Sequence, residues 1–134
     1  NLMDQSCREL LPIAKEKGVG VMVRSVLMRG ILTDKKFNFH EKLRAIKLQR
    51  QKYRELLDEQ ITSLSDFATK FVLSFPEVSA ALVGIDRQEF LDKAVELADG
   101  NYMDSEQLAK AESLAWPDPD FLDLSVWDRN GWLK

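Results

Sequence analysis

The segment GVGVMVRSVLMRG, residues 18–30, carries the strongest structural signal in this chain. It starts as a short, continuous apolar run and then changes abruptly to a polar sequence that ends at Gly30. The segment PEVSAALVGID, residues 76–86, has the same plan. Continuous apolar runs are typical of strands in a parallel sheet, because such strands are buried on both faces. Two strands cannot form a sheet that covers itself, so the sequence predicts one part of a larger barrel.

Composition and charge narrow the class of protein. The 134 residues are 45% hydrophobic and 31% charged, which is typical of a soluble globular domain. The formal net charge of -3 predicts no general affinity for polyanions. The single cysteine, Cys7, excludes an internal disulfide, and without a nearby His or Cys we expect no metal site. No apolar run reaches the ~18 residues of a membrane span and no signal peptide pattern is present, so cytoplasmic residence is expected.

Helical and strand-like patterns alternate along the chain. Apolar residues recur at helical spacing before each strand segment, and Gly18 and Pro76 stand where the preceding helices end. This order indicates a βαβ unit with a right-handed crossover, whose ligands bind at the loops that follow the carboxyl ends of the strands. The expected elements are a helix at 6–17, a strand at 19–23, a loop at 24–36, helices at 40–60 and 63–75, a strand at 79–85, and helices at 86–97 and 105–115.

Two runs of the sequence resemble the aldo-keto reductase family. Residues 1–35, NLMDQSCRELLPIAKEKGVGVMVRSVLMRGILTDK, are similar to its sixth-helix and seventh-strand region. Within them RSVLMRGILT, residues 24–33, follows the family pattern aromatic-Ser-Pro-Leu-x-x-Gly-x-Leu-Thr. Residues 63–99, SLSDFATKFVLSFPEVSAALVGIDRQEFLDKAVELAD, are similar to its last helix, eighth strand and following helix. The resemblance implies an α/β fold, the C-terminal portion of a (β/α)8 TIM barrel with two parallel strands and several helices.

The same resemblance implies a function and a limit. Members of the family are NADP(H)-dependent oxidoreductases of small carbonyl compounds and alcohols, with NAD(H) as the alternative cofactor here. Their Asp-Tyr-Lys-His catalytic group lies in the N-terminal half of the barrel, so no catalytic residue is assigned in this chain. The only histidine, His40, lies in a polar segment, matches no motif position and is interpreted as a solvated or capping residue. This chain alone is therefore expected to bind cofactor poorly and to be inactive.

The loop after the first strand is one part of the cofactor site that the resemblance implies. In the family the strand-end aromatic residue stacks on the nicotinamide, and Arg24 holds that position here. A guanidinium plane can stack on a ring, but Arg24 paired with a carboxylate at the barrel mouth is the alternative. The following positions align with the family's pyrophosphate loop, whose backbone N–H groups and basic side chain suit a diphosphate, although an ordinary βα loop would look alike. The residues of this part are Arg24, Ser25, Leu27, Arg29 and Gly30.

The turn after the second strand is the other part of the implied site. In the family this turn and the next helix N-terminus hold the adenosine 2′-phosphate, and a helix N-terminus favours anions. Phe90 stands where the family often has Arg or Gln, which leaves the choice between NADP(H) and NAD(H) open. A capping box formed by Asp86 and Glu89 explains the same residues without any ligand. The residues of this part are Gly84, Ile85, Asp86, Arg87 and Phe90.

Two other classes of function stay open. Residues 34–54 carry eight basic and two acidic side chains, and a basic face can bind nucleic acid. A solvated helix face, or pairing with the acidic tail, explains that pattern more simply, so nucleic-acid binding is the least favoured function. A non-catalytic interaction module is the other class, because exposed strand edges favour a homodimer of this chain.

The end of the sequence differs from the rest in composition. We divide the chain into a C-terminal barrel segment at residues 1–115 and a tail at residues 116–134, which is rich in Pro, Asp and Trp and has no clear period. The resemblance places this tail over the substrate opening, where it would shape specificity. In the alternative interpretation its tryptophans only pin the tail to the barrel.

Overall fold

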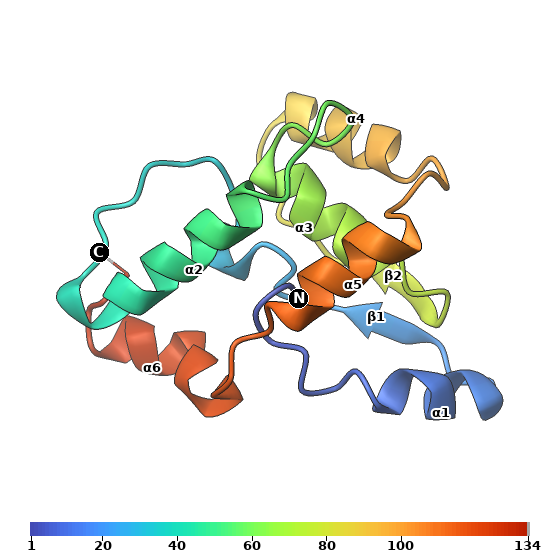
Figure 1. The fold of residues 1–134 in the computed structure, drawn as a ribbon, viewed down its shortest axis with the longest axis horizontal. Helices are drawn as coiled ribbons and strands as arrows, with labels where there is room; N and C mark the ends of the chain where they lie inside the picture. Colours follow the sequence, from blue (N-terminus) through green and yellow to red (C-terminus); the bar gives the residue numbers. More distant parts are fainter. Residues whose placement is uncertain (134) are drawn as a thin grey trace.

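The computed structural model describes residues 1–133 (Figure 1). Six α-helices, three short 3-10 helices and two strands follow one another in those residues. No helix within them is both long and apolar enough to cross a bilayer. The elements are α1 (Leu10–Glu16), β1 (Val21–Val23), η1 (Met28–Gly30), η2 (Glu41–Leu43), α2 (Arg44–Arg54), α3 (Leu64–Leu73), β2 (Val78–Ala81), α4 (Gln88–Leu97), α5 (Ser105–Ser113), η3 (Pro119–Leu122) and α6 (Leu124–Arg129).

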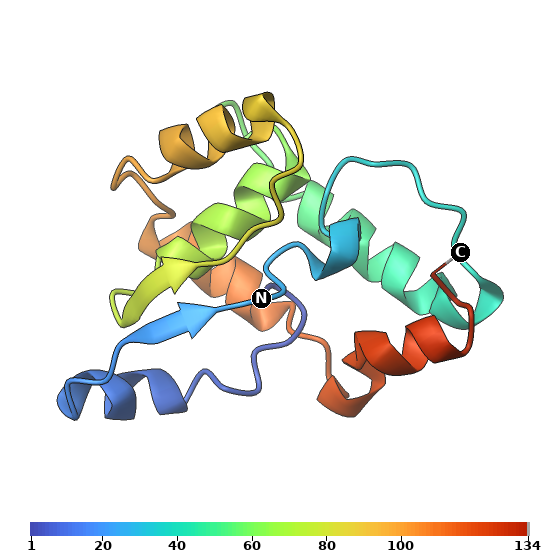
Figure 2. The ribbon, with the colours of Figure 1, turned by 180° about the vertical axis from the view of Figure 1, so that it is seen from behind.

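The two strands lie side by side and run in the same direction, as Figure 2 shows. Val21 pairs with Val78 and Val23 with Ala81, and the register shifts between Val21 and Met22. Leu82 extends the pairing, because its N–H donates to the carbonyl of Val23 at 2.8 Å. The crossover that joins the strands contains α2 and α3. The predicted fold class, a parallel α/β segment of a barrel, is confirmed.

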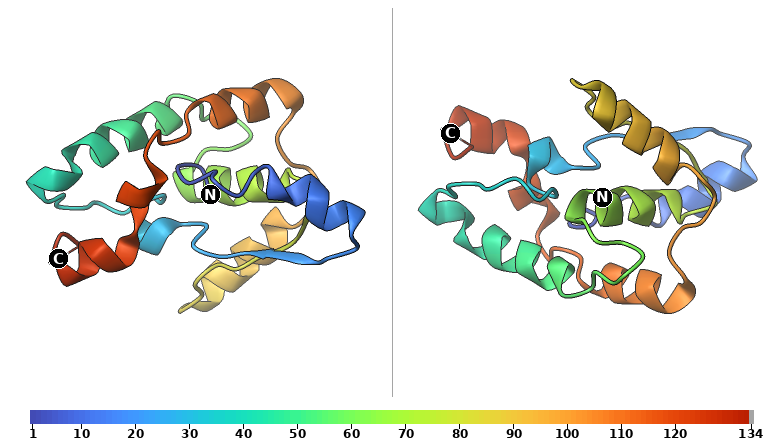
Figure 3. Two further views of the ribbon diagram at one scale, coloured as in Figure 1. Left: turned by 90° about the horizontal axis from the view of Figure 1, so that it is seen from below. Right: turned by 90° about the horizontal axis from the view of Figure 1, so that it is seen from above.

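Helix α3 lies at the centre of the hydrophobic core. Figure 3 shows it between α4 on one side and α2 and α5 on the other. The helix begins where the Ser63 side chain accepts the N–H of Asp66 at 3.1 Å, which satisfies one donor of the first turn. Phe67 and Phe71 are buried, and the Phe71 ring meets that of Phe75 edge to face at 5.1 Å between centroids. The apolar spacing predicted this helix over 63–75, and the structure confirms it within two residues at its end.

The segment predicted as one helix over 40–60 is shorter and starts differently. The Nδ1 atom of His40 accepts the N–H of Lys42 at 3.2 Å and caps η2, so the capping interpretation of His40 is confirmed. Helix α2 then ends at Arg54. Asp58 captures the N–H groups of Gln60 and Ile61, each at 2.8 Å, and this local turn competes with further helix. The prediction of helix up to residue 60 is therefore wrong.

Other predicted boundaries also move inward. Helix α1 begins at Leu10 and not at residue 6, which leaves Pro12 in the first turn, where its missing N–H costs nothing. Strand β2 ends at Ala81 because its partner β1 has only three residues. Helix α4 begins after Arg87, which is extended and makes no side-chain cap. The predicted capping box of Asp86 and Glu89 is therefore wrong.

The tail contains structure that periodicity did not reveal. It forms η3 and α6, and the Trp127 side chain is 0% exposed in the core. The Trp127 indole Nε1 donates to the carbonyl of Phe121 at 2.6 Å, and the backbone N–H of Trp116 donates to the carbonyl of Met3 at 2.8 Å. A buried aromatic side chain with a satisfied N–H is a strong anchor. The division of the chain at residue 115 remains a proposal.

Candidate functional site

The loop after β1 has an unusual backbone. Ser25, Met28 and Arg29 have φ angles of 56°, 45° and 52°, in the left-handed region that non-glycine residues rarely adopt. Gly30 follows with a φ of 93°. Strained backbone persists only where the surrounding structure holds it in place, and it is concentrated at functional sites. This loop is therefore the first place to look for a binding site.

Buried apolar side chains hold the strained loop. Val26 and Met28 are each 1% exposed, while Ile31 and Leu32 are completely buried. Two hydrogen bonds also close the turn: the N–H groups of Gly30 and Leu32 donate to the carbonyl of Leu27 at 2.8 and 3.2 Å. Four apolar side chains of the loop and its continuation thus enter the core, while the Arg29 side chain between them is exposed. The energy of burial can offset the unfavourable φ angles.

A hollow of about 330 Å3 lies between this loop and the tail. Three of the predicted cofactor residues, Arg24, Ser25 and Arg29, line it together. Leu27 and Gly30 belong to the same loop but do not line the hollow. Its remaining walls come from the start of the chain and from the tail, which sequence reasoning did not connect to this loop. These walls are formed by Asn1, Asp4, Leu122, Asp123, Leu124 and Ser125, while Met28 of the loop also contributes to the lining.

Charges of both signs surround the hollow. The carboxylate of Asp123 accepts the N–H and the hydroxyl of Ser125 at 2.8 and 2.5 Å, and these hydrogen bonds lower its pKa. Asp4 accepts the hydroxyl of Ser6 at 2.6 Å. The Arg29 guanidinium forms an ion pair with Asp128 of α6 at 3.1 Å. The carboxylates of Asp4 and Asp123, which line the hollow, thus each accept a hydrogen bond from a neighbouring residue. Of the two arginines of the loop, only Arg29 forms an ion pair within residues 1–133, and its partner belongs to the tail.

The loop offers the donors that a diphosphate needs. Within residues 1–133 the backbone N–H groups of Ser25, Leu27 and Arg29 donate no hydrogen bond. The Arg24 and Arg29 guanidinium groups add positive charge at the same hollow. Several N–H groups of a turn together with basic side chains are a common arrangement for binding phosphate groups. These residues therefore fit the diphosphate of a dinucleotide.

Arg50 of α2 supports the chain that leaves this loop, and sequence reasoning missed it. Its guanidinium Nη2 donates to the carbonyls of Thr33 and Lys35, at 2.6 Å for Lys35, and its side chain is almost completely buried. Asp34 between them accepts the N–H of Leu64 at 3.0 Å and pairs with Arg54. The available signal was helical spacing, because the buried residues of α2 include Ile46, Gln49, Arg50 and Tyr53.

These contacts also change the view of the basic segment. Arg50 and Arg54 are engaged with residues 33–35, so they do not belong to a solvated basic face. These two arginines do not pair with the acidic tail, because Arg54 pairs with Asp34 and Arg50 donates to the Lys35 carbonyl. The remaining basic side chains of α2 are exposed. The structure gives the segment fewer free cations than its composition indicates.

The second predicted part of the cofactor site lies after β2, the neighbouring strand. Gly84, Ile85, Asp86, Arg87 and Phe90 are all exposed, and none of them lines the hollow. The Arg87 guanidinium pairs with Glu89 at 3.3 Å and lies 5.8 Å from the centroid of the Phe90 ring. The first turn of α4 has no side-chain cap, and within residues 1–133 the N–H groups of Gln88 and Glu89 donate no hydrogen bond, so these two are open to an anion. The two parts follow adjacent strand ends but do not share one cavity.

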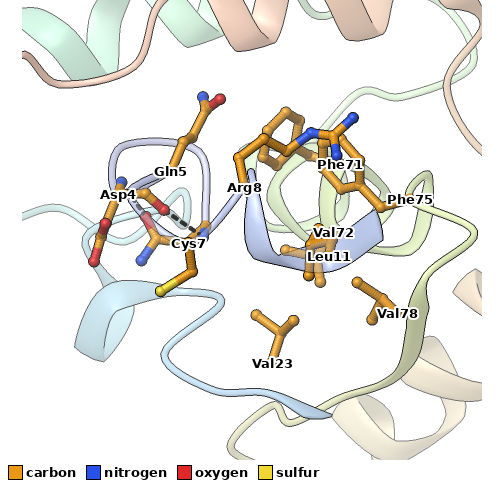
Figure 4. A pocket seen from close by; sticks show the side chains of 11 residues that line it. Asp4, Gln5, Cys7, Arg8, Leu11, Val23, Phe71, Val72, Phe75 and Val78 are labelled. Atoms are coloured by element: carbon orange, nitrogen blue, oxygen red, sulfur yellow. Dashed lines mark hydrogen bonds between the residues drawn. The ribbon is translucent and has the colours of Figure 1, made fainter. Parts of the chain in front are cut away.

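A smaller hollow of about 90 Å3 lies between α1, α3 and the strands (Figure 4). Leu11, Val23, Val72 and Val78 point toward it from four elements, and its walls are mainly apolar. Cys7 is a free thiol at its exposed end. None of the predicted cofactor residues reaches this hollow. It is a packing gap of the α/β layer and not part of the candidate site.

The fold and the site define a class of protein: a β/α barrel segment with a polar, anion-compatible loop at the carboxyl end of a strand. The family model described as Aldo/keto reductase family matches residues 1–115. The chain belongs to this family.

Solved structures give the same fold. The aldo-keto reductase AKR11C1 from Bacillus halodurans, in its holo form and in its apo form, superimposes with a TM-score of 0.72 over 87% of this chain at 21% sequence identity. The chain spans 41% of the length of that reductase. At this identity the likeness concerns the fold.

Proposed function

We propose that this chain supplies part of the cofactor site of an NADP(H)-dependent reductase of small carbonyl compounds, with NAD(H) as the alternative cofactor. Membership of the aldo/keto reductase family supports an oxidoreductase with a nicotinamide cofactor. The observation that carries the proposal is the shared hollow of Arg24, Ser25 and Arg29 beside a strained strand-end loop. The cofactor would supply the hydride; the residues of this chain would bind and orient it.

Each part of the loop has its own role in this proposal. The N–H groups of Ser25, Leu27 and Arg29 and the Arg29 guanidinium hold the diphosphate, because charge-assisted hydrogen bonds are the strong ones. Arg24, at the strand end, would contact the nicotinamide through its planar guanidinium. Gly30 permits the turn that returns the chain to the core. Arg50 keeps the following segment in place from behind.

The second part of the site would decide between the two nicotinamide cofactors. Arg87 stands at the uncapped N-terminus of α4, where a 2′-phosphate would meet both the N–H groups and the guanidinium. Gly84, Ile85, Asp86 and Phe90 would border the adenosine. Asp86 opposes a phosphate there, which is why NAD(H) remains the alternative.

No proton-transfer role is proposed for this chain. His40 caps η2 through Nδ1, and Tyr53 donates its hydroxyl to two backbone carbonyls in the core. Both side chains are thus used by the fold. The proton donor of the complete enzyme is proposed to lie outside these 134 residues. We further propose that the enzyme resides in the cytoplasm and that its substrate is a small carbonyl compound. The chain alone is proposed to bind cofactor weakly and not to reduce carbonyl compounds.

A fluorescence titration tests the proposal, because the three tryptophans belong to the tail that borders the hollow. We expect NADP+ to quench the tryptophan fluorescence saturably. We expect Arg29→Gln to weaken NADP+ binding by about tenfold or more, because the substitution removes charge-assisted hydrogen bonds. Arg44→Gln is the matched control, since Arg44 is exposed on α2. Arg87→Gln should weaken NADP+ but not NAD+. Equal binding by the Arg29 and Arg44 variants would contradict the proposal.

A second candidate, self-association, is favoured by one observation. Met22 of β1, Leu82 next to β2 and Val95 of α4 are 70%, 52% and 68% exposed, although all three are large and apolar. A two-stranded sheet also leaves open edges, and such edges pair with other chains. We propose that a second copy of this chain covers the exposed strand edges when no other part of a barrel does so.

Light scattering on a size-exclusion column tests this second candidate. We expect a dimer, and we expect Met22→Lys to shift it to monomer because a charge on the strand would be buried in the interface. Leu48→Lys is the matched control, since Leu48 is 61% exposed on α2, away from the sheet. A monodisperse monomer of the unaltered chain would end the idea.

A further inference from the structure

We propose that Asp128 is the internal counter-ion of Arg29, and that a diphosphate ligand displaces it, so that the tail helix α6 responds to occupation of the hollow. The inference rests on the proposed function, because it concerns the same loop. It assigns a role to a carboxylate of the tail that the family motifs do not cover. The family match ends at residue 115, so the tail lies beyond it.

The first support is the contact itself. The Arg29 Nη1 and Asp128 Oδ2 atoms are 3.1 Å apart, and the two side chains are 53% and 60% exposed. An ion pair so open to water is weak and easily exchanged. Arg29 follows the buried Met28 in a loop with three positive φ angles at non-glycine residues, so the fold fixes the point from which the Arg29 side chain leaves the backbone. The cation therefore stays near the hollow, and its partner is replaceable.

The second support is that the tail and the loop share one cavity. Residues 122–125 of the tail line the hollow together with Arg24, Ser25 and Arg29. Asp128 lies in α6, one turn after the Leu124 and Ser125 that line the hollow. Trp127 is buried beside it and holds α6 to the core through Phe121. Loss of the ion pair would therefore loosen the helix end without releasing the tail.

The third support is the charge of the ligand. A diphosphate carries more negative charge than one carboxylate and accepts from several donors, including the N–H groups of Ser25 and Arg29, which line the hollow and donate no hydrogen bond within residues 1–133. Asp128 can satisfy only the guanidinium. The exchange of partners thus favours a ligand with two phosphate groups over one with a single carboxylate. Asp128 acts as a competitor that sets the affinity of the site.

The test compares Asp128→Asn with Asp120→Asn, which changes the net charge equally. Asp120 is exposed in η3, does not line the hollow, and forms no ion pair within residues 1–133. Inorganic diphosphate is titrated by calorimetry into the full chain and both variants. We expect Asp128→Asn to bind it about two- to fivefold more tightly, the range of one exposed ion pair, and Asp120→Asn to bind it as the unaltered chain does.

Hydrogen exchange of residues 124–129 is the second readout. Saturating diphosphate should speed exchange in the unaltered chain toward the rate of Asp128→Asn, and should leave that variant unchanged. Three outcomes would overturn the inference. They are equal diphosphate affinities of the unaltered chain and Asp128→Asn, an equal gain of affinity in Asp128→Asn and Asp120→Asn, and the absence of any diphosphate binding. NADP+ and NAD+ are titrated in parallel. If diphosphate gives the expected results but neither nucleotide binds, the proposed function is refuted, while the displacement of Asp128 by diphosphate is still supported.

Discussion

The hydroxyl group of Tyr53 lies 2.8 Å from the carbonyl oxygen of Leu2 and 2.6 Å from that of Leu114. The ring is completely buried in the core. One side chain of α2 thus joins the start of the chain to the residue that follows α5. Gln49, one turn earlier on α2, also donates to the Leu114 carbonyl, at 2.5 Å. This junction positions the segment around Asn1 that forms one wall of the hollow.

Tyr53→Phe should destabilise the chain without changing its fold. The substitution keeps the buried ring and removes the donor, while the Leu2 and Leu114 carbonyls each keep a second donor, the side-chain amides of Gln5 and Gln49. We expect the free energy of unfolding to fall by about 0.5–1.5 kcal/mol, the net contribution of one hydrogen bond. Urea denaturation measures it. Tyr102→Phe, at a half-buried tyrosine, is the control and should change stability little.

Stability should fall in alkaline solution through Tyr53. Burial raises the pKa of Tyr53 to about 12, above the ordinary value near 10. Below pH 10 the tyrosine is neutral in both the folded and the unfolded chain, so it contributes no pH dependence. Between pH 10 and about 12 the unfolded chain loses this proton first, and the free energy of unfolding decreases. Denaturation curves at several pH values should show a smaller decrease for Tyr53→Phe, and equal slopes would contradict the assignment.

Arg50→Met should loosen the segment behind the candidate site. The guanidinium donates to the carbonyls of Thr33 and Lys35, and hydrogen bonds from charged groups are worth about 1.5–3 kcal/mol. We expect a loss of stability of about 2–3 kcal/mol and faster hydrogen exchange around residues 33–37. Arg44→Met on the exposed face of α2 is the comparison. Similar exchange rates in both variants would show that Arg50 does not hold this segment.

Gly30→Ala should strain the loop that carries the candidate site. Gly30 has a φ of 93°, which an L side chain rarely adopts, and an added Cβ would lie 3.4 Å from the Phe37 ring. We expect a loss of about 1–2 kcal/mol in thermal or urea unfolding. Gly84→Ala is the control, because Gly84 has no positive φ and no atom within 4 Å of a Cβ. Equal stability of the two variants would mean that the loop adapts without cost.

Local patterns in the sequence were sufficient for both strands, for the helices before the tail and for the family. The continuous apolar runs predicted two parallel strands, and the spacing of Phe67, Ala68 and Phe71 predicted α3. These predictions succeeded because burial on one helix face or on both strand faces leaves a short, periodic signal. Boundaries were less certain, since turns such as that at Asp58 compete with the helix through single hydrogen bonds. The tail helix α6 is too short to leave a period.

The composition of the hollow could be known only from the tertiary structure. The resemblance to the family motif placed Arg24, Ser25 and Arg29 in one loop, and their role with a cofactor remains a prediction. The pairing of Arg29 with Asp128, and the inward turn of Arg50, depend on how the crossover and the tail fold back over the strands. Such contacts join residues far apart in the chain, and no short-range pattern of apolar or charged residues encodes them. The sequence determined which segments are buried; the packing of those segments decided which charges meet.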